Sequence, residues 1–174
     1  MKKYVVITGA SSGIGYEAAK RFAQRGKNIV AVARNEEKLA KLKAEITGTV
    51  NPPVEVIIKT YDLTQKENIY AVYNSVKDLD IEAWINNAGF GDYCSVGNQN
   101  LAKMEDMLSL NIEAVALFSA LYVRDFADKE HTQLINVSSV GGYTIVPTAV
   151  TYCATKFFVA SFTEGLSREL SAVG

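Results

Sequence analysis

The sequence contains very little cysteine and histidine. Its 174 residues include two cysteines, Cys94 and Cys153, and one histidine, His131. Two cysteines are too few for a disulfide framework, and they do not form the C-x-x-C spacing of a zinc site. We therefore expect no metal site, and a reducing, cytoplasmic location. His131 lies in a polar turn and is expected at the surface rather than in a catalytic role.

The sequence also lacks an excess of charge and a long apolar run. Its 18 Lys and Arg residues nearly balance 19 Asp and Glu residues, which gives a formal net charge of −1. Such a balance gives no electrostatic reason to expect nucleic acid or an anionic membrane as a partner. No uninterrupted apolar run approaches the roughly 20 residues of a membrane span. The first apolar stretch is too short for a signal peptide.

What the sequence does contain is a regular alternation of short apolar runs and helical patterns. The runs are rich in β-branched residues, which is typical of strands buried on both faces of a parallel sheet. The pattern predicts one α/β domain over residues 1–174, with a doubly wound, Rossmann-type parallel sheet in three α/β/α layers. We predict strands at residues 4–8, 28–33, 54–61, 83–86 and 133–137, and helices at residues 17–24, 35–46, 65–79, 101–126 and 151–171.

A glycine-rich turn follows the first predicted strand directly. Gly9, Gly13 and Gly15 form the spacing G-x-x-x-G-x-G, and a helical pattern begins immediately after them. Glycine allows a tight turn and lets a pyrophosphate approach the free N–H groups at the helix N-terminus. The context favours nucleotide binding, although a plain strand-to-helix turn would have the same composition.

The second predicted strand ends in Ala33-Arg34. NAD sites usually place an acidic residue here for the ribose 2′-hydroxyl, whereas an arginine suits the 2′-phosphate of NADP. The nearest acids, Glu36 and Glu37, lie inside the next helix. We therefore predict NADP(H) rather than NAD(H), because a guanidinium can bind phosphate with two hydrogen bonds. The alternative is an ordinary surface arginine at the end of a strand.

Polar residues follow the other predicted strands as well. Asp62 could accept a hydrogen bond from an adenine amino group, or could simply cap the helix that begins near residue 65. Asn111 lies in an otherwise apolar helix, which usually means a specific hydrogen bond. All loops that follow parallel strands lie along one edge of the sheet, where ligands bind in such folds. That edge is expected to collect Gly9–Gly15, Arg34, Asp62, Asn87–Gly89, Ser138–Ser139 and Tyr152.

Tyr152 and Lys156 are four residues apart in the last predicted helix. Residues at this spacing lie on the same face of a helix. A lysine ammonium close to a phenol favours the phenolate, so such a tyrosine could act as a general acid and base. The same pair also occurs by chance in many helices.

These residues together resemble the short-chain dehydrogenase/reductase family. The pieces occur in the family's order and at its spacing, and they span nearly the whole chain. They are residues 8–15 (TGASSGIG), Asp62-Leu63, Asn86-Asn87-Ala88-Gly89, Asn111, Asn136-Val137-Ser138-Ser139 and Tyr152-Cys153-Ala154-Thr155-Lys156.

The resemblance implies a role for each matching residue. Tyr152 would give a proton to the carbonyl oxygen and Lys156 would bind the nicotinamide ribose and lower the pKa of the tyrosine. Ser139, with Ser138 as second choice, would polarise the substrate oxygen, and Asn111 would hold a water of a proton relay. Asp62 and Leu63 would meet the adenine. The other implied cofactor-binding residues are Gly9, Ser11, Ser12, Gly13, Ile14, Gly15, Arg34, Asn87, Ala88 and Gly89.

The sequence departs from the family at its C-terminal end. Family members continue past the tyrosine-bearing helix with two more strands and a substrate-binding pair of helices, which this chain lacks. We expect a truncated or naturally short chain that binds NADP but reduces carbonyls poorly. A homodimer or homotetramer is expected through residues 101–126 and 151–171, which form a helical interface in the family.

Three functions are compatible with the sequence. The first is an oxidoreductase that transfers a hydride between NADP(H) and a carbonyl or alcohol. The second is a non-catalytic NADP-binding sensor or scaffold, and the third is an interaction protein whose long helices build an oligomer. The loop residues Phe90, Tyr93, Tyr143, Ile145 and Val146 are expected to line the pocket, which would suit an apolar or aromatic carbonyl compound, although aromatic residues in loops often serve only packing. The substrate itself stays open among fatty-acyl, steroid, sugar and xenobiotic compounds.

Overall fold

The computed structural model describes residues 2–173 and contains the predicted parallel sheet. Its five strands lie in the order β3-β2-β1-β4-β5, and all neighbours are parallel. Val6 in the central strand lies opposite Val30 on one side and Trp84 on the other. The chain therefore switches direction across the sheet between β1 and β4. The strands are β1 (Tyr4–Thr8), β2 (Asn28–Ala33), β3 (Val56–Thr60), β4 (Ile81–Asn86) and β5 (Gln133–Asn136).

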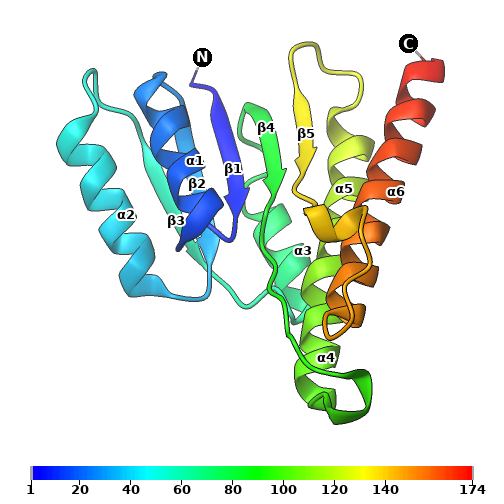
Figure 1. The fold of residues 1–174 in the computed structure, drawn as a ribbon. Coiled ribbons are helices and arrows are strands. Elements are labelled where there is room, and N and C mark those ends of the chain that lie inside the picture. Colours follow the sequence, from blue (N-terminus) through cyan, green and yellow to red (C-terminus); the bar gives the residue numbers. More distant parts are fainter. Residues whose placement is uncertain (1, 174) are drawn as a thin grey trace.

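Helices cover both faces of this sheet (Figure 1). On one face, α1 (Gly13–Gln24) and α2 (Glu36–Thr49) bury side chains such as Ala19 and Leu42 against β1 and β2. On the other face, α3 (Lys66–Asn74) and α5 (Ala114–Phe126) contribute to a second buried cluster. The predicted three-layer α/β/α architecture is thus confirmed.

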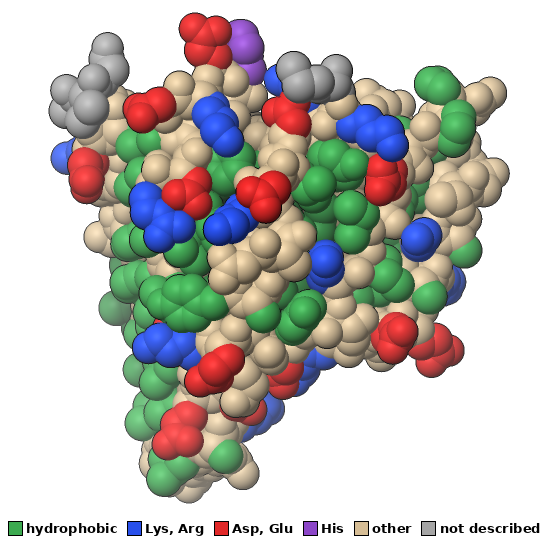
Figure 2. Space-filling view, turned by 180° about the vertical axis from the view of Figure 1, so that it is seen from behind, with side chains coloured by type: hydrophobic (Ala, Val, Ile, Leu, Met, Phe, Trp, Pro, Cys, Tyr) green, Lys and Arg blue, Asp and Glu red, His purple; other side chains and the backbone are tan. Residues whose placement is uncertain are grey.

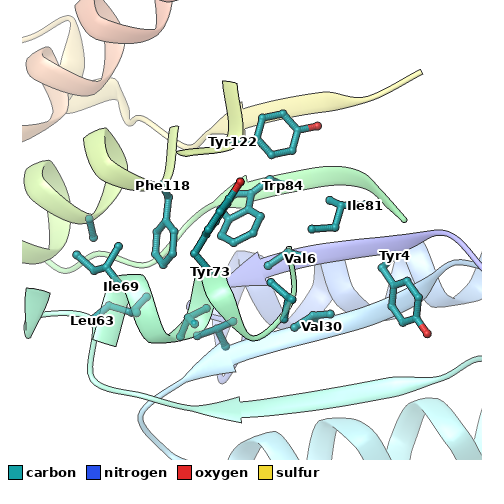
Figure 3. Packing of buried hydrophobic residues seen from close by; sticks show 14 of the residues in the cluster. Tyr4, Val6, Val30, Leu63, Ile69, Tyr73, Ile81, Trp84, Phe118 and Tyr122 are labelled. Atoms are coloured by element: carbon teal, nitrogen blue, oxygen red, sulfur yellow. The ribbon is translucent and has the colours of Figure 1, made fainter. Parts of the chain in front are cut away.

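Trp84 lies at the centre of the second cluster and is fully buried (Figure 3). Its ring lies 5.6 Å from that of Tyr73 in α3 and 5.0 Å from that of Phe118 in α5, measured between ring centroids. Its indole N–H donates to Asn86 Oδ1 at 3.0 Å. Aromatic pairs at these distances stabilise a core beyond their buried area, so Trp84 fixes both helices on the sheet.

The predicted helix over residues 101–126 contains an irregular turn. It consists of α4 (Leu101–Leu108), a π-helical turn η2 (Ser109–Glu113) and α5. Such π-turns are rare and often occur at functional sites, and this one contains Asn111. The whole segment is long and apolar enough to cross a membrane by length and composition alone. Phe118, Tyr122 and Phe126 pack in the core beside the sheet, as in the core helix of a globular domain.

Several other boundaries differ from the prediction. The first helix begins at Gly13 rather than residue 17, the second ends at Thr49 rather than residue 46, and β4 begins at Ile81 rather than residue 83. The third strand covers Val56–Thr60 rather than residues 54–61. The helix predicted for residues 65–79 is α3, which ends at Asn74. The residues that follow form turns, and Val76 among them is buried in the core.

The last helix, α6 (Val150–Val173), stands beside the sheet at the end where β5 is the edge strand (Figure 1). It packs along η2 and α4, and the short 3₁₀ turn η3 (Val140–Gly142) lies against it. Another 3₁₀ turn, η1 (Val96–Asn98), precedes α4. Figure 2 shows apolar side chains along the edge of the molecule where α6 lies, at the left of that view.

Candidate active site

A hollow of about 500 Å³ lies at the carboxyl ends of the strands. Loops from all five strand ends and the start of α6 contribute to its wall. Of the residues that sequence reasoning placed at this edge, the hollow is lined by Gly9, Ser11, Ser12, Gly13, Ile14, Arg34, Asp62, Leu63, Asn87, Ala88, Gly89, Ser138, Tyr152 and Lys156. Three other predicted site residues do not line the hollow but lie next to residues that do. They are Gly15 beside Gly9, Asn111 beside Gly89, and Ser139, which follows Ser138.

The glycine turn is packed too closely for side chains. Gly9 has a φ of +68°, and a Cβ built there would lie 2.8 Å from the Cα of Ala88. A Cβ built on Gly15 would lie 2.5 Å from the carbonyl oxygen of Gly9. Residues other than glycine rarely adopt such a φ. The two glycines therefore let the turn fold tightly against the loop that follows β4.

Thr8 and Asn87 join the loops that follow β1 and β4. The Thr8 hydroxyl oxygen accepts hydrogen bonds from the backbone N–H groups of Asn87 and Ala88, both at 3.0 Å. The amide nitrogen of Asn87 donates to the Thr8 carbonyl at 3.1 Å and to the Gly9 carbonyl at 3.3 Å. The sequence analysis included Thr8 in the TGASSGIG motif but assigned it no role.

The N-terminus of α1 faces the hollow without an internal cap. Ser12 is the N-cap residue in an extended conformation, and its side chain makes no capping hydrogen bond. The first turn contains no acidic residue. Free N–H groups and the helix dipole favour an anion at such an end. With the tight glycine turn beside it, this end of α1 fits a pyrophosphate.

Arg34 lies at the rim, directly after β2. Its side chain is exposed, and among the described residues no carboxylate lies within 4 Å of it. The next residue, Asn35, caps α2 by accepting a hydrogen bond from the Lys38 N–H at 2.9 Å. No carboxylate among the described residues therefore competes with a ligand phosphate for the Arg34 guanidinium.

Asp62 forms a local turn at the end of β3. Its Oδ1 accepts hydrogen bonds from the N–H of Thr64 at 3.0 Å and from the hydroxyl of Thr64 at 2.8 Å. This is an Asx-turn, and the N-cap residue of α3 is Gln65. Asp62 thus does not cap α3, as the sequence allowed, but forms a turn with Thr64 before the helix begins. Asp62 and the buried Leu63 lie on the wall of the hollow.

Tyr152 and Lys156 stand side by side on α6. The Lys156 nitrogen lies 5.9 Å from the centroid of the Tyr152 ring and donates a hydrogen bond to the Val137 carbonyl at 3.0 Å. Lys156 is only 6% exposed. Because burial disfavours the charged form, the pKa of Lys156 is lowered.

The two candidate serines have different partners. Ser138 donates its hydroxyl hydrogen to the Lys156 carbonyl at 2.9 Å, so it helps to hold α6. The Ser139 hydroxyl oxygen accepts from the Gly141 N–H at 3.1 Å. A Cβ on Gly141 would lie 3.4 Å from Tyr152 Cε1 and 3.6 Å from Ser139 Oγ. Gly141 thus lies close to both the Tyr152 ring and the Ser139 hydroxyl, and in the described part of the chain that hydroxyl hydrogen has no acceptor.

Asn111 connects the loop after β4 to α6. It is 1% exposed, accepts from the Phe90 N–H at 3.1 Å and donates to the Phe90 carbonyl at 2.9 Å. Its amide nitrogen also donates to the Thr155 hydroxyl at 3.1 Å. A Cβ built on Gly89 would lie 2.9 Å from Asn111 Oδ1 and 3.6 Å from Lys156 Nζ. The π-turn thus brings Asn111 next to Lys156 without a direct bond.

Comparison with known proteins gives the family. The family model for short chain dehydrogenases matches residues 3–174. The chain belongs to the short-chain dehydrogenase family. The predicted resemblance is confirmed, and with it the assignment of the chain as an oxidoreductase of this family.

Individual short-chain dehydrogenases show the same likeness. An uncharacterised oxidoreductase of Staphylococcus saprophyticus is 33% identical over 99% of this chain and 69% of its own length. The structure of a short-chain dehydrogenase from Sphingobium yanoikuyae in complex with NADPH is 34% identical, with a TM-score of 0.91 over 98% of this chain and 66% of that one. An alcohol dehydrogenase from Comamonas testosteroni, described as bulky-bulky ketone specific, is 33% identical with a TM-score of 0.91, over 98% of this chain and 68% of that one. The chain spans about two thirds of the length of these relatives.

We predict that Gly15→Ala lowers the free energy of unfolding by about 1–3 kcal/mol, because its Cβ must displace the Gly9 carbonyl or Asn87. Gly48→Ala, in α2, is the matched control, since a Cβ there meets nothing within 4 Å. It should stabilise the fold by at most about 0.5–1 kcal/mol, as alanine does in helices. Urea unfolding followed by circular dichroism measures both. Equal stability of Gly15→Ala and the natural protein would contradict the close packing.

Proposed function

We propose that the protein transfers a hydride between NADP(H) and a carbonyl or alcohol substrate, with Tyr152 as the general acid and base. The observation that carries this proposal is the shared hollow, in which Tyr152 and Lys156 face the glycine turn and Arg34. A nucleotide bound along the turn would end beside the phenol. The family and the NADPH complex of a relative support the same proposal.

The residues present fit a dinucleotide cofactor. Gly9 and the uncapped start of α1 would hold the pyrophosphate, and Asp62 and Leu63 would meet the adenine. The preference for NADP(H) over NAD(H) rests on Arg34, whose guanidinium has no carboxylate partner within residues 2–173 and suits a 2′-phosphate. When bound, the cofactor would supply the hydride, while the protein supplies orientation and proton transfer.

Four side chains have roles in proton transfer in this proposal. Tyr152 gives its phenolic proton to the carbonyl oxygen during reduction and takes one from the alcohol during oxidation. Ser139 donates a hydrogen bond to the same oxygen. Lys156 holds its ammonium group close to the Tyr152 ring, and Asn111 would hold a water that links Lys156 to solvent as a proton relay.

An apolar carbonyl compound is the proposed substrate class. Of the expected pocket residues, Phe90 and Tyr93 line the hollow, and the Tyr93 ring packs on that of Tyr152. The other expected pocket residues, Tyr143, Ile145 and Val146, are exposed and do not line it. Apolar walls with few polar groups are typical of small-molecule sites. A relative described as specific for bulky-bulky ketones supports this class.

We also propose self-association through residues 101–126 and 151–171, whose outer faces are partly apolar.

We predict that Arg34→Ala weakens NADPH binding by about 10- to 100-fold, because a charge-assisted hydrogen bond to a phosphate is lost. NADH binding should not change, since NADH has no 2′-phosphate. Enhancement of the reduced nicotinamide fluorescence on binding measures both affinities. Arg25→Ala, at the C-terminal end of α1, is the control for the loss of a surface cation. Equal affinity of the natural protein for NADPH and NADH would overturn the cofactor preference.

For the chemistry, Tyr152→Phe should lower kcat for reduction of an aryl ketone by about 10²–10⁴-fold, the usual contribution of a general acid. NADPH binding should stay within about twofold, because only the hydroxyl is removed. Consumption of NADPH is followed by absorbance. Retained turnover in Tyr152→Phe would remove Tyr152 from its role. Binding of NADPH without any turnover by the natural chain would instead indicate a non-catalytic binding module.

A further inference from the structure

The segment that follows β4 lies directly against the ring of Tyr152. A Cβ built on Gly91 would lie 3.2 Å from Tyr152 Cδ2, so the backbone of Gly91 touches the face of the ring. The ring of Tyr93 packs on the other part of Tyr152, with the centroids 6.2 Å apart and the planes at 44°. The ring orientation of Tyr152 therefore depends on where residues 91–93 are held.

Asp92, between these two contacts, is fixed by three donors. Lys103 Nζ in α4 donates to its Oδ1 at 2.6 Å. The Gln99 side-chain nitrogen lies 3.5 Å from Oδ2, and the Cys94 thiol lies 3.6 Å from the same oxygen. The hydrogen bond from Lys103 lowers the pKa of Asp92, which keeps this carboxylate charged at neutral pH.

Gln99 continues this chain of hydrogen bonds to α6. It is a buried polar residue, only 8% exposed. Its Oε1 accepts a hydrogen bond from the Thr151 hydroxyl at 2.8 Å. Thr151 directly precedes Tyr152 in the first turn of α6. Gln99 thus uses its oxygen on α6 and its nitrogen on Asp92, which requires a side chain with both an acceptor and a donor.

We propose that Gln99, together with Asp92 and Lys103, positions the ring of Tyr152. The inference rests on the proposed role of Tyr152 as the general acid and base. The connected side chains tie α4, the segment after β4 and the start of α6 around the phenol. A stabilising role alone does not account for the arrangement, because Lys103 is 51% exposed and exposed ion pairs contribute little to stability.

The test compares four variants with one control. Gln99→Leu removes both hydrogen bonds, and Gln99→Glu keeps an oxygen for Thr151 but loses the donor to Asp92. Lys103→Met removes the cation, whereas Lys103→Arg retains it. The control, Lys27→Met, breaks the Lys27–Glu82 ion pair of 2.7 Å, which lies at the amino ends of β2 and β4, away from the hollow.

The first measurement does not require turnover. Each protein is treated with tetranitromethane, and nitration of Tyr152 is quantified by peptide mass spectrometry relative to Tyr70, which is 40% exposed on α3. Gln99→Leu, Gln99→Glu and Lys103→Met should raise the nitration ratio of Tyr152 to Tyr70 severalfold. Lys103→Arg and Lys27→Met should leave this ratio unchanged.

The second measurement is kinetic, with an aryl ketone and NADPH. A misplaced phenol should lower kcat by about tenfold or more and change KM little, because small displacements of a reacting group are costly. Lys103→Arg should recover the natural kcat. An unchanged nitration ratio in both Gln99→Leu and Lys103→Met would overturn the inference whether or not the protein has turnover. Inactivity of the natural protein with altered nitration would overturn only the proposed function.

Discussion

Two reciprocal hydrogen bonds at Lys156 hold the site together. Its ammonium group donates to the Val137 carbonyl, and its own carbonyl accepts from the Ser138 hydroxyl. Both partners lie in the segment that leaves β5, so side chain and backbone of one residue attach α6 to the edge of the sheet. A buried ammonium is costly unless it is bonded. Here the hydrogen bond to the Val137 carbonyl offsets part of that cost and places the ammonium group beside Tyr152, so stability and the proposed chemistry depend on the same contact.

A buried polar network extends this attachment into the core. Trp84 donates to Asn86, whose amide nitrogen donates to Asn136 Oδ1 at 2.8 Å, and Asn136 donates to Thr163 in α6 at 3.0 Å. Ser119 in α5 bonds both asparagines. Buried networks with all members bonded favour one arrangement over its alternatives. The network therefore transmits the register of β4 and β5 to α6, two turns of helix beyond Lys156.

The central strands follow from the sequence because β1 and β2 are almost entirely apolar and buried along their whole length, whereas β5 (QLIN) is only partly buried. The glycine turn and Arg34 could be placed at one edge, since parallel strands all end there. The partners of Thr8 and Gln99 could not be predicted, because each bonds a residue more than 50 positions away in the chain. The π-turn at Asn111 could not be predicted for the same reason, because it depends on contacts that are distant in the chain. Its side chain is satisfied by Phe90 and Thr155, and no local pattern encodes those contacts. The choice between Ser138 and Ser139 likewise depends on tertiary contacts, since the Ser138 hydroxyl is bonded to the Lys156 carbonyl in α6.

The most direct measurement of the central claim is the fate of the hydride. The protein is incubated with NADPH that carries deuterium at both positions of C4 of the nicotinamide ring and with an aryl ketone, and the alcohol is analysed by mass spectrometry. If Tyr152 and the nucleotide hollow form one catalytic site, the alcohol contains one deuterium on its carbinol carbon, and the Tyr152→Phe protein yields almost none. A protein that binds NADPH but forms no deuterated alcohol would contradict the claim.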